Sequence, residues 1–353
     1  MFKLKQNNTT VRTELVAGIT TFMAMAYILM VNAGMFSTLG GDALGASYYN
    51  AVYIATALSA VFGTLLIGLL SNLPLAQASG MGLNAFFVYS VCIGMGFTYA
   101  NALVMVLVDG IVFLLLTVTG LRRLIFDAIP KAVKAAIAPG IGLFIAFLGL
   151  QNSGIVVNSD STLVDLHSFN IIFGHTTWAE IMPLLITIAA LIAIGAMSKK
   201  KIKGAVFWGI IGGAVLYYAL GLLTIDGFYA SNVQSKLSLN IIQPFRDFFN
   251  ISFGKVFTEG FNFSEYIAAN GVGSFAATFI ASMLAFCMVD MFDTLGTLYG
   301  ACSAGNLLDK DGNVPNMNKA MFADAAATCF GAVCGTSTVT VSYTHLRAHE
   351  TLM

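Results

Sequence analysis

The most constraining feature of the chain is an apolar run that keeps two carboxylates. Over residues 266–308 the only charged side chains are those of Asp290 and Asp293, and the rest is apolar enough to cross a bilayer. A carboxylate near the membrane centre costs roughly 2.5–3.5 kcal/mol on insertion scales. A chain that keeps two of them there is expected to use at least one, which favours a substrate or proton site inside a membrane transporter.

The composition places the whole chain in a membrane. Hydrophobic residues make up 58% of the 353 residues, charged residues only 10%, and the mean hydropathy is +0.83. A soluble domain of this size would carry about 25% charged residues. The first apolar run is also far longer than the apolar part of a signal peptide, so no cleavable signal is expected. These observations predict an all-α polytopic membrane protein that forms one folding unit.

The basic residues predict the orientation of the chain. Of the 17 Lys and Arg residues, 13 lie before the first span or in connections expected on one side, whereas the opposite connections hold 3. The densest group is the cluster 199–203. Because cytoplasmic connections are enriched in Lys and Arg, the N-terminus is expected in the cytoplasm.

Apolar runs divide the chain into successive membrane elements. A broken third element, 75–93, is rich in Gly and polar residues, and Pro139-Gly140 is expected to interrupt the fifth span. The pieces 244–250 and 261–268 are aromatic and amphipathic, which indicates interfacial segments. The spans are expected at about 15–39, 49–70, 102–121, 132–150, 178–197, 205–223, 272–299 and 320–333.

Two small, polar segments at membrane depth occupy corresponding places in the chain. Leu75–Gly82 is the third apolar element counted from Leu15, and Gly335–Val341 is the third counted from Val272. An odd number of spans separates the two series, so the second would run with inverted topology. Paired Gly-interrupted segments of this kind indicate the midplane site of a transporter, although small residues also favour close helix packing.

The last twelve residues do not continue the membrane pattern. The segment 342–353 replaces an expected apolar continuation and holds two of the four histidines. We interpret it as a non-native tail and leave it out of the fold prediction. The second half of the transporter is therefore expected to be truncated near its tenth span.

Six ordered blocks stand out along the chain: Phe2–Lys5, Thr10–Thr21, Gly80–Phe87, Asp290–Thr297, Pro315–Ala325 and Gly335–Thr340. Together they resemble the adenine/guanine/hypoxanthine permease (AzgA-like) branch of the nucleobase:cation symporters, within the xanthine/uracil permease superfamily. The resemblance covers the chain up to Val341, and its number of blocks makes it specific.

The resemblance implies a fold and a domain organisation. The family has fourteen spans in two inverted seven-span repeats, in which the discontinuous third and tenth spans carry short strands and purine binds between them. The first four spans of each repeat form a core domain and the last three a gate domain. The implied divisions are 1–121 (first core part), 122–224 (gate), 225–270 (outer connection), 271–341 (second core part, truncated) and 342–353 (tail).

The resemblance also implies the site. Asp293, at the start of Asp-Thr-Leu-Gly-Thr, matches the acidic position that contacts substrate, and Gly80–Asn84 and Gly335–Thr340 would lie beside it. A carboxylate accepts from purine ring N–H groups and an amide both donates and accepts, while a half-helix start offers free N–H groups. The predicted substrate-binding residues are Asp293, Asn84, Gly82, Thr297 and Gly80.

Asp290 and Asp293 are the predicted proton-coupling pair. Their spacing of three residues places both on one face of a helix, where Thr297 lies one turn beyond Asp293. Two carboxylates close together in a low dielectric repel, so one is expected to hold a proton. A role for Asp290 in core hydrogen bonding is the alternative.

Other residues are predicted to be structural. Asp324 is expected to open the ninth span and to favour a helix N-terminus electrostatically. Phe86 and Phe87 could cover a base, but aromatic helix residues more often pack in a core or against lipid. The five cysteines have no metal-like spacing and are expected to be packing residues.

The sequence predicts a secondary active transporter of the inner membrane that takes up purine nucleobases by proton symport, and not an enzyme. No histidine or paired cysteine at membrane depth supplies a metal site or a catalytic set. No cofactor and no nucleic-acid partner are expected; the purine, the lipid bilayer and a homodimer are the candidate partners. Uracil, xanthine or another small solute remains an alternative substrate, and sodium an alternative coupling ion.

Overall fold

The structure is a computed structural model, and two compact units are distinguished in it. Unit 1 combines Met1–Ile141 with Ile241–Met353, and unit 2 is Gly142–Asn240. The predicted domain boundaries stay predictions. The tail 342–353 and the connections 121–129 and 230–239 lie outside the described residues. The structure describes residues 10–120, 130–169, 176–200, 202, 204–229, 240, 242–305, 307–309 and 313–341.

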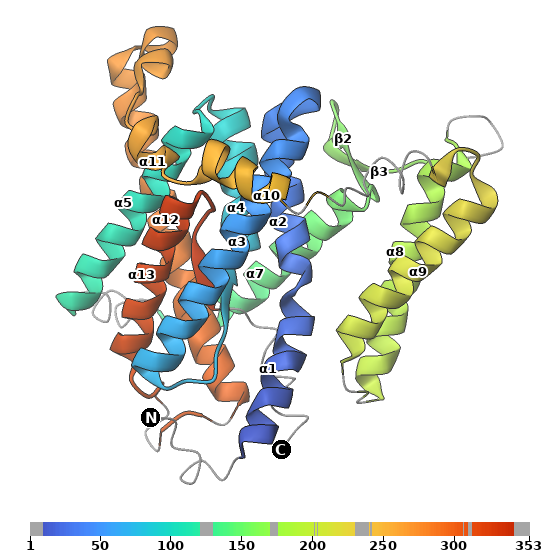
Figure 1. The fold of residues 1–353 in the computed structure, drawn as a ribbon, viewed down its shortest axis with the longest axis horizontal. Coiled ribbons are helices and arrows are strands. Elements are labelled where there is room, and N and C mark those ends of the chain that lie inside the picture. Colours follow the sequence, from blue (N-terminus) through green and yellow to red (C-terminus); the bar gives the residue numbers. More distant parts are fainter. Residues whose placement is uncertain are drawn as a thin grey trace. The chain divides into compact units, whose positions relative to one another are not determined.

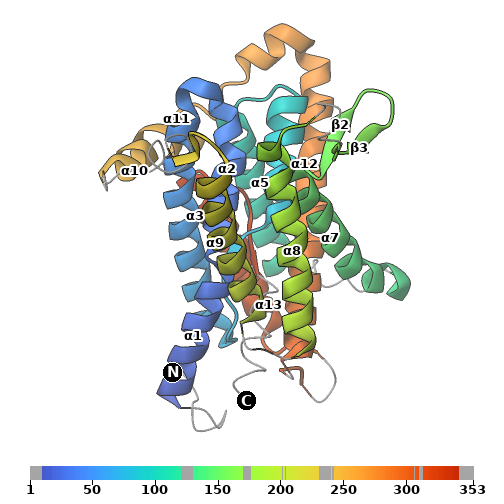
Figure 2. The same cartoon turned by 90° about the vertical axis from the view of Figure 1, so that its right-hand side faces the viewer.

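The first two predicted spans form the N-terminal helices of unit 1 (Figure 2). The side chain of Thr10 accepts from the Thr13 backbone N–H and so caps the first helix. The predicted first span is divided at Ala26, and the second begins eight residues before the predicted Tyr49. The elements are α1 (Val11–Met25), α2 (Tyr27–Ser37), η1 (Thr38–Gly40) and α3 (Gly41–Ser71).

The third element is broken, as predicted. After α3 the chain forms a strand of three residues, a short helix and a π-helical continuation, before it returns as one long helix. The π-helical part is a further irregularity in this element. Such geometry is rare and is often found at functional sites. These elements are β1 (Gln77–Ser79), α4 (Met81–Ala85), η2 (Phe86–Gly94) and α5 (Tyr99–Val118).

The described part of the second half of unit 1 contains three short helical segments, two long helices and a short strand. Helix α12 bends at Gly271, where φ is 81°. The predicted interfacial piece 261–268 overlaps the first turns of α12, before this bend. The following helix starts at Met317, three residues before the expected Ala320. The elements are α10 (Ile242–Asp247), η4 (Phe248–Ser252), α11 (Lys255–Thr258), α12 (Ser264–Ala304), α13 (Met317–Cys334) and β4 (Val339–Val341).

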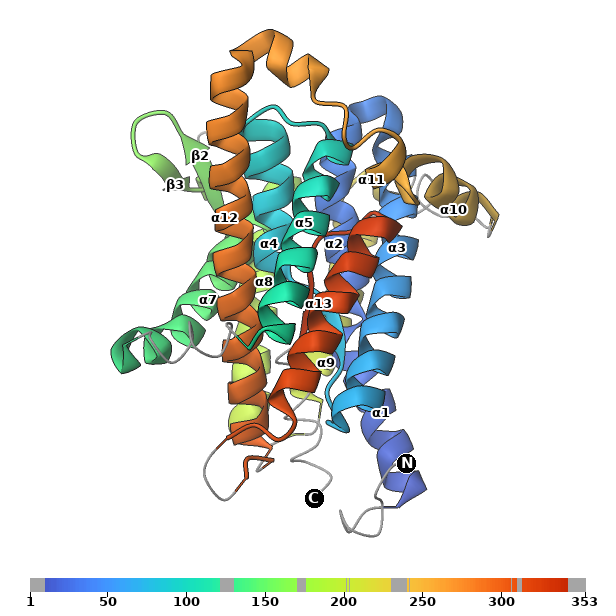
Figure 3. The ribbon, with the colours of Figure 1, turned by 90° about the vertical axis from the view of Figure 1, so that its left-hand side faces the viewer.

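Helix α13 packs against both α3 and α5, and Figure 3 shows it between them. Small residues allow this close approach. A Cβ on Gly63 of α3 would lie 3.0 Å from the Cβ of Ala327, and one on Gly110 of α5 would lie 2.6 Å from Cys329 Sγ. Association of membrane helices depends on such close packing, so α13 is held firmly beside the broken third element.

Unit 2 contains a helical hairpin and a strand hairpin (Figure 1). Helices α8 and α9 pack on each other through Met182, Ile186 and Phe228. The strand hairpin in the predicted outer loop was not foreseen, and α7, which crosses the boundary between the units, continues through Pro139 where an interruption was predicted. The elements are α7 (Lys131–Asn152), β2 (Val156–Ser159), β3 (Leu163–Leu166), α8 (Trp178–Lys199) and α9 (Ala205–Thr224).

Within the described residues, five helical stretches are long and apolar enough to cross a membrane. This result supports the predicted class of all-α polytopic membrane protein. The stretches are Val11–Ser71, Tyr99–Val118, Trp178–Lys199, Ala205–Thr224 and Ser264–Ser303.

Candidate functional site

The two Gly-rich segments meet in a short antiparallel sheet. Strand β1 pairs with β4 through Gln77 and Val341, Ala78 and Thr340, and Ser79 and Val339. The pairing is extended by the Gly80 N–H, which donates to the Thr338 carbonyl at 3.1 Å. All six strand residues are buried. Such backbone pairing satisfies peptide groups that would otherwise be costly at membrane depth. The antiparallel direction agrees with the expected inversion, although the repeat itself stays a prediction.

Asp293 of α12 lies directly against this crossing. Its Oδ2 is 3.4 Å from the position that a Cβ on Gly80 would occupy, and Thr340 Cγ2 is 3.1 Å from the same point. Asp293 is partly exposed, whereas Asp290 is completely buried. The two acids therefore differ in access, and Asp293 is the one that a solute at the crossing could reach.

Asn84 of α4 is completely buried, and its backbone N–H donates to the Gly80 carbonyl at 3.0 Å. Its Oδ1 accepts from Ser79 Oγ at 3.0 Å, whereas its Nδ2 has no hydrogen-bond partner among the described residues. Thr338 Oγ1 also lacks a partner there and lies 3.9 Å from the same Gly80 Cβ position. Buried polar atoms are normally paired, so this donor and this hydroxyl are candidates to bind a ligand.

Gly82 and Thr297 have different surroundings. Gly82 is partly exposed in the first turn of α4. Thr297 is buried, and its hydroxyl donates to the carbonyls of Asp293, at 2.6 Å, and Thr294, at 3.2 Å. The hydroxyl hydrogen of Thr297 is therefore donated to backbone carbonyls of its own helix, α12. The predicted substrate role of Thr297 has no support in this geometry beyond its nearness to Asp293.

A further buried carboxylate, that of Asp324 in α13, lies next to the same sheet. It accepts from Thr294 Oγ1 at 2.7 Å and from Gln77 Nε2 at 3.2 Å, and Thr294 Oγ1 is 3.3 Å from Thr340 Oγ1. The predicted role of Asp324 at a helix start is wrong, because α13 begins seven residues earlier and the side chain is fully buried. The cost of an acid at membrane depth was the sequence signal that could have identified it.

A chain of hydrogen bonds joins the crossing to the N-terminal helices. Asn32 Nδ2 of α2 donates to Thr56 Oγ1 at 2.7 Å and to Thr336 Oγ1 at 3.0 Å. Thr336 Oγ1 is in turn 3.3 Å from Ser79 Oγ, the donor to Asn84. Sequence reasoning did not identify Asn32 or Thr56, because isolated polar residues in apolar runs carry no motif.

The aromatic residues of the third element pack against other rings. Phe86 lies edge-on to Phe286 with centroids 4.9 Å apart, and Phe87 contacts Phe36 at 5.0 Å. Phe87 is completely buried. These contacts favour the packing interpretation of both residues.

In the described ranges of the chain, no three His, Cys, Asp or Glu side chains gather as a metal site would require. The five cysteines are free thiols, and Cys92, Cys302 and Cys334 are buried. Their positions are consistent with packing.

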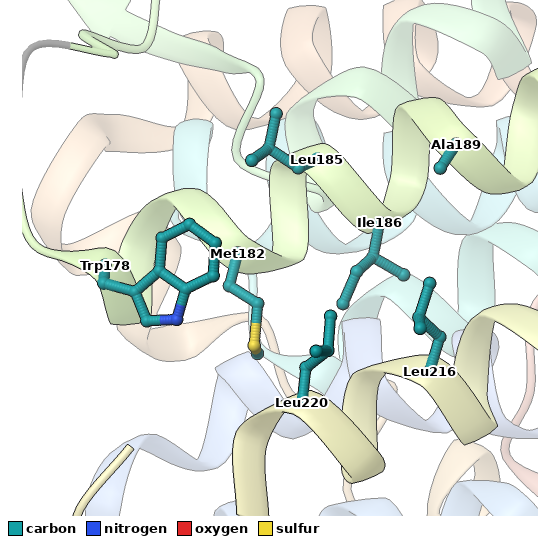
Figure 4. Close-up of a pocket in the computed structure, with 7 residues that line it drawn as sticks. All are labelled: Trp178, Met182, Leu185, Ile186, Ala189, Leu216 and Leu220. Carbon is teal, nitrogen blue, oxygen red and sulfur yellow. The ribbon is translucent and has the colours of Figure 1, made fainter. Parts of the chain in front are cut away.

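A pocket of about 180 Å³ lies on the hairpin of α8 and α9 (Figure 4). Its lining is apolar apart from the indole of Trp178, whose Nε1 already donates to Thr224 Oγ1 at 2.9 Å. A polar solute would find no oriented partner there, so the pocket is not the candidate site. The lining residues are Trp178, Met182, Leu185, Ile186, Ala189, Leu216 and Leu220.

The chain is similar to known membrane permeases. The chain matches the permease family over residues 12–345. It is 35% identical to the guanine/hypoxanthine permease PbuG of Bacillus subtilis and 34% identical to PbuO of the same organism, each over 96% of this chain and 70% of the relative. It is 32% identical to the adenine permease AdeP of Escherichia coli, over 96% of this chain and 67% of that protein. The chain therefore belongs to the nucleobase permease family and is a multi-pass membrane transporter, not an enzyme.

Proposed function

We propose that the protein is a secondary active transporter that takes up purine nucleobases. The observation that carries this proposal is the crossing of β1 and β4. There, Thr338 Oγ1 and the partly exposed carboxylate of Asp293 lie beside Gly80, and the unpartnered Nδ2 belongs to Asn84, whose Oδ1 accepts from the adjoining Ser79. An amide donor, a hydroxyl and a carboxyl group, which can accept a hydrogen bond whether ionised or protonated, fit a flat, neutral base rich in hydrogen-bonding groups.

Purine is the favoured base because of the relatives. PbuG and PbuO are guanine/hypoxanthine permeases and AdeP is an adenine permease. A purine offers ring N–H groups to Asp293 and ring nitrogens or an exocyclic oxygen to the amide of Asn84. The alternatives are the pyrimidine uracil and the dioxopurine xanthine, which present similar edges, and competition measurements distinguish them.

We propose that protons drive uptake, with Asp293 as the group that takes up and releases the proton. A carboxylate among apolar helices favours its neutral form unless a partner is present, and a second acid, Asp324, accepts from Thr294, the residue next to Asp293 in α12. Protonation would let Asp293 bind a neutral base without leaving a net charge in the membrane. Sodium is the alternative coupling ion.

Transport would follow alternating access around a fixed midplane site, with the core domain moving against the gate domain. We propose that the protein lies in the inner membrane. Its N-terminus would be cytoplasmic, because the basic residues concentrate in the connections on that side. A homodimer remains a candidate assembly.

Uptake of radiolabelled hypoxanthine, guanine and adenine by a host that lacks its own purine permeases tests the proposal. Saturable uptake that collapses with a protonophore and is indifferent to a sodium gradient is expected. Excess unlabelled purine should compete, and uracil should not. Uptake that ignores both gradients would contradict symport, and uracil competition stronger than that of purines would contradict the substrate class.

Variants of the two α12 acids complete this test. Asp293→Asn should abolish concentrative uptake while the protein still reaches the membrane. Normal concentrative uptake by Asp293→Asn would remove the role assigned to this residue. Asp290→Asn should act mainly on folding, since Asp290 is completely buried.

A further inference from the structure

The break after α13 must be stabilised by groups outside the helix. Gly335 ends the helix with a φ of 96°, which a side chain would strain, and its N–H donates to the Gly331 carbonyl at 2.9 Å. The last carbonyls of a helix lack partners in the helix itself, and at membrane depth each unsatisfied group costs several kcal/mol. The partners of these carbonyls therefore decide how firmly the following strand is placed.

Tyr99, the first residue of α5, supplies one such partner. Its hydroxyl donates to the Gly335 carbonyl in a short hydrogen bond, and the side chain is buried. A Cβ on Gly335 would lie 2.6 Å from the Tyr99 oxygen, so the contact depends on glycine at this position. Three residues beyond Gly335 is Thr338, whose hydroxyl belongs to the candidate site.

The ring of the same tyrosine contacts the other broken span. Its centroid lies 5.9 Å from that of Phe87, in an edge-on arrangement, and 6.0 Å from that of Phe36. Phe87 follows Asn84 by three residues in the same helical run. Tyr99 thus joins, through one side chain, the helical run that carries Asn84 and the turn that leads to Thr338.

The outer connection contacts the same turn, next to Tyr99. The Gly254 N–H donates to the Val333 carbonyl at 2.9 Å, and Ser252 packs directly against Gly335. Figure 3 shows α11, which follows Gly254, beside the end of α13. Ser252 and Tyr99 therefore both contact the break, and the turn at Gly335 has little room to move.

We propose that Tyr99 is a positioning residue that holds the two broken spans in register, so that Asn84 and Thr338 face the same bound base. The effect of Tyr99 on substrate binding rests on the function proposed above. Its effect on the pairing of β1 with β4 does not depend on that function. Loss of the hydroxyl should loosen β4 and weaken binding without removing any group that contacts the substrate.

The test compares Tyr99→Phe with Tyr48→Phe in the full chain. Both changes remove one tyrosine hydroxyl from the same aromatic cluster, because the rings of Tyr48 and Tyr99 are 5.4 Å apart, but only Tyr99 donates to Gly335. Tyr99→Phe is expected to raise the KM for hypoxanthine about fivefold at an unchanged maximal rate per molecule in the membrane, as loss of one net hydrogen bond implies. Tyr48→Phe should leave both values unchanged.

Hydrogen exchange of the purified protein provides the readout that is independent of substrate. The peptides that cover 77–85 and 336–341 should exchange about fivefold faster in Tyr99→Phe and at the original rate in Tyr48→Phe. Equal exchange in the two variants, or a Tyr99→Phe change in KM no larger than that of Tyr48→Phe, would overturn the positioning role. If the original protein transports no purine, the proposed function fails, and the exchange comparison still decides the role of Tyr99.

Discussion

The carboxylate of Asp293 lies close to Gly80 at the crossing of the two broken spans: a Cβ on Gly80 would be in van der Waals contact with Asp293 Oδ2, at 3.4 Å. Gly80 has a φ of −75°, which any residue can adopt, so glycine is required here for space and not for backbone conformation. The absence of a side chain leaves the carboxylate accessible from the strand. This contact leads to the first prediction.

Gly80→Val should reduce purine uptake at least tenfold, because its branched side chain must displace either Asp293 or Thr340. Overpacking of this kind costs about 1–3 kcal/mol. Gly68→Val on α3 is the matched control, since no atom lies within 4 Å of its Cβ position. Initial uptake rates, corrected for the amount of protein in the membrane, measure the effect. Equal rates for the two variants would show that Gly80 does not limit the space around Asp293.

Thr338→Val should separate stability from binding. The Thr338 hydroxyl is buried without a partner among the described residues, so an isosteric methyl should leave the melting temperature unchanged or raise it. If the hydroxyl binds substrate, its loss should raise the KM by a factor of about 5 to 10.

Thr328→Val provides the opposite comparison. Thr328 Oγ1 donates to the Val339 carbonyl at 3.1 Å and accepts from the Val339 N–H at 3.2 Å. The same change there should lower stability by about 1–3 kcal/mol, because it leaves strand groups unpaired. Thermal unfolding in detergent measures both variants. A Thr338→Val protein as unstable as Thr328→Val would mean that the Thr338 hydroxyl supports the fold.

Asp324 is predicted to tolerate an amide better than an apolar side chain. Asn at this position can still accept from Thr294, and its amide group can donate to Gln77 Oε1, which has no partner among the described residues, once the Gln77 amide turns over. Asp324→Leu removes the acceptor of both the Gln77 amide and the Thr294 hydroxyl. It should lower the free energy of unfolding by about 1–3 kcal/mol more than Asp324→Asn does.

The measurement is again thermal unfolding, with Asp42→Asn at the exposed start of α3 as the control for loss of one carboxylate. A Leu variant as stable as the Asn variant would contradict a hydrogen-bonding role for Asp324 in the core. Uptake by a stable Asp324→Asn protein then reports whether its charge affects Asp293.

Much of the fold was predictable because hydropathy and helix breakers are local signals. The broken segment around Gly80 and its counterpart near Gly335 were expected from these signals, whereas the short strands in them were implied by the family resemblance. The register that pairs Gln77 with Val341 was not predictable, because it depends on how α3 and α13 pack. Asp324 was misassigned for the same reason: its partners Gln77 and Thr294 are distant in sequence. The different access of Asp290 and Asp293 also required the packed structure.

Gly110→Ala should destabilise the protein although alanine favours a helix. A helical Gly→Ala change normally gains about 0.5–1 kcal/mol. At Gly110 the added Cβ would lie 2.6 Å from Cys329 Sγ and 3.0 Å from the Cys329 backbone nitrogen, which cannot move without shifting α13. A net loss of about 1–3 kcal/mol is therefore expected. Gly212→Ala in α9, with no atom within 4 Å of its Cβ position, should be neutral or stabilising. Thermal unfolding of the two variants in the same detergent decides the matter, and a Gly110→Ala protein as stable as Gly212→Ala would show that α5 and α13 are not packed this closely.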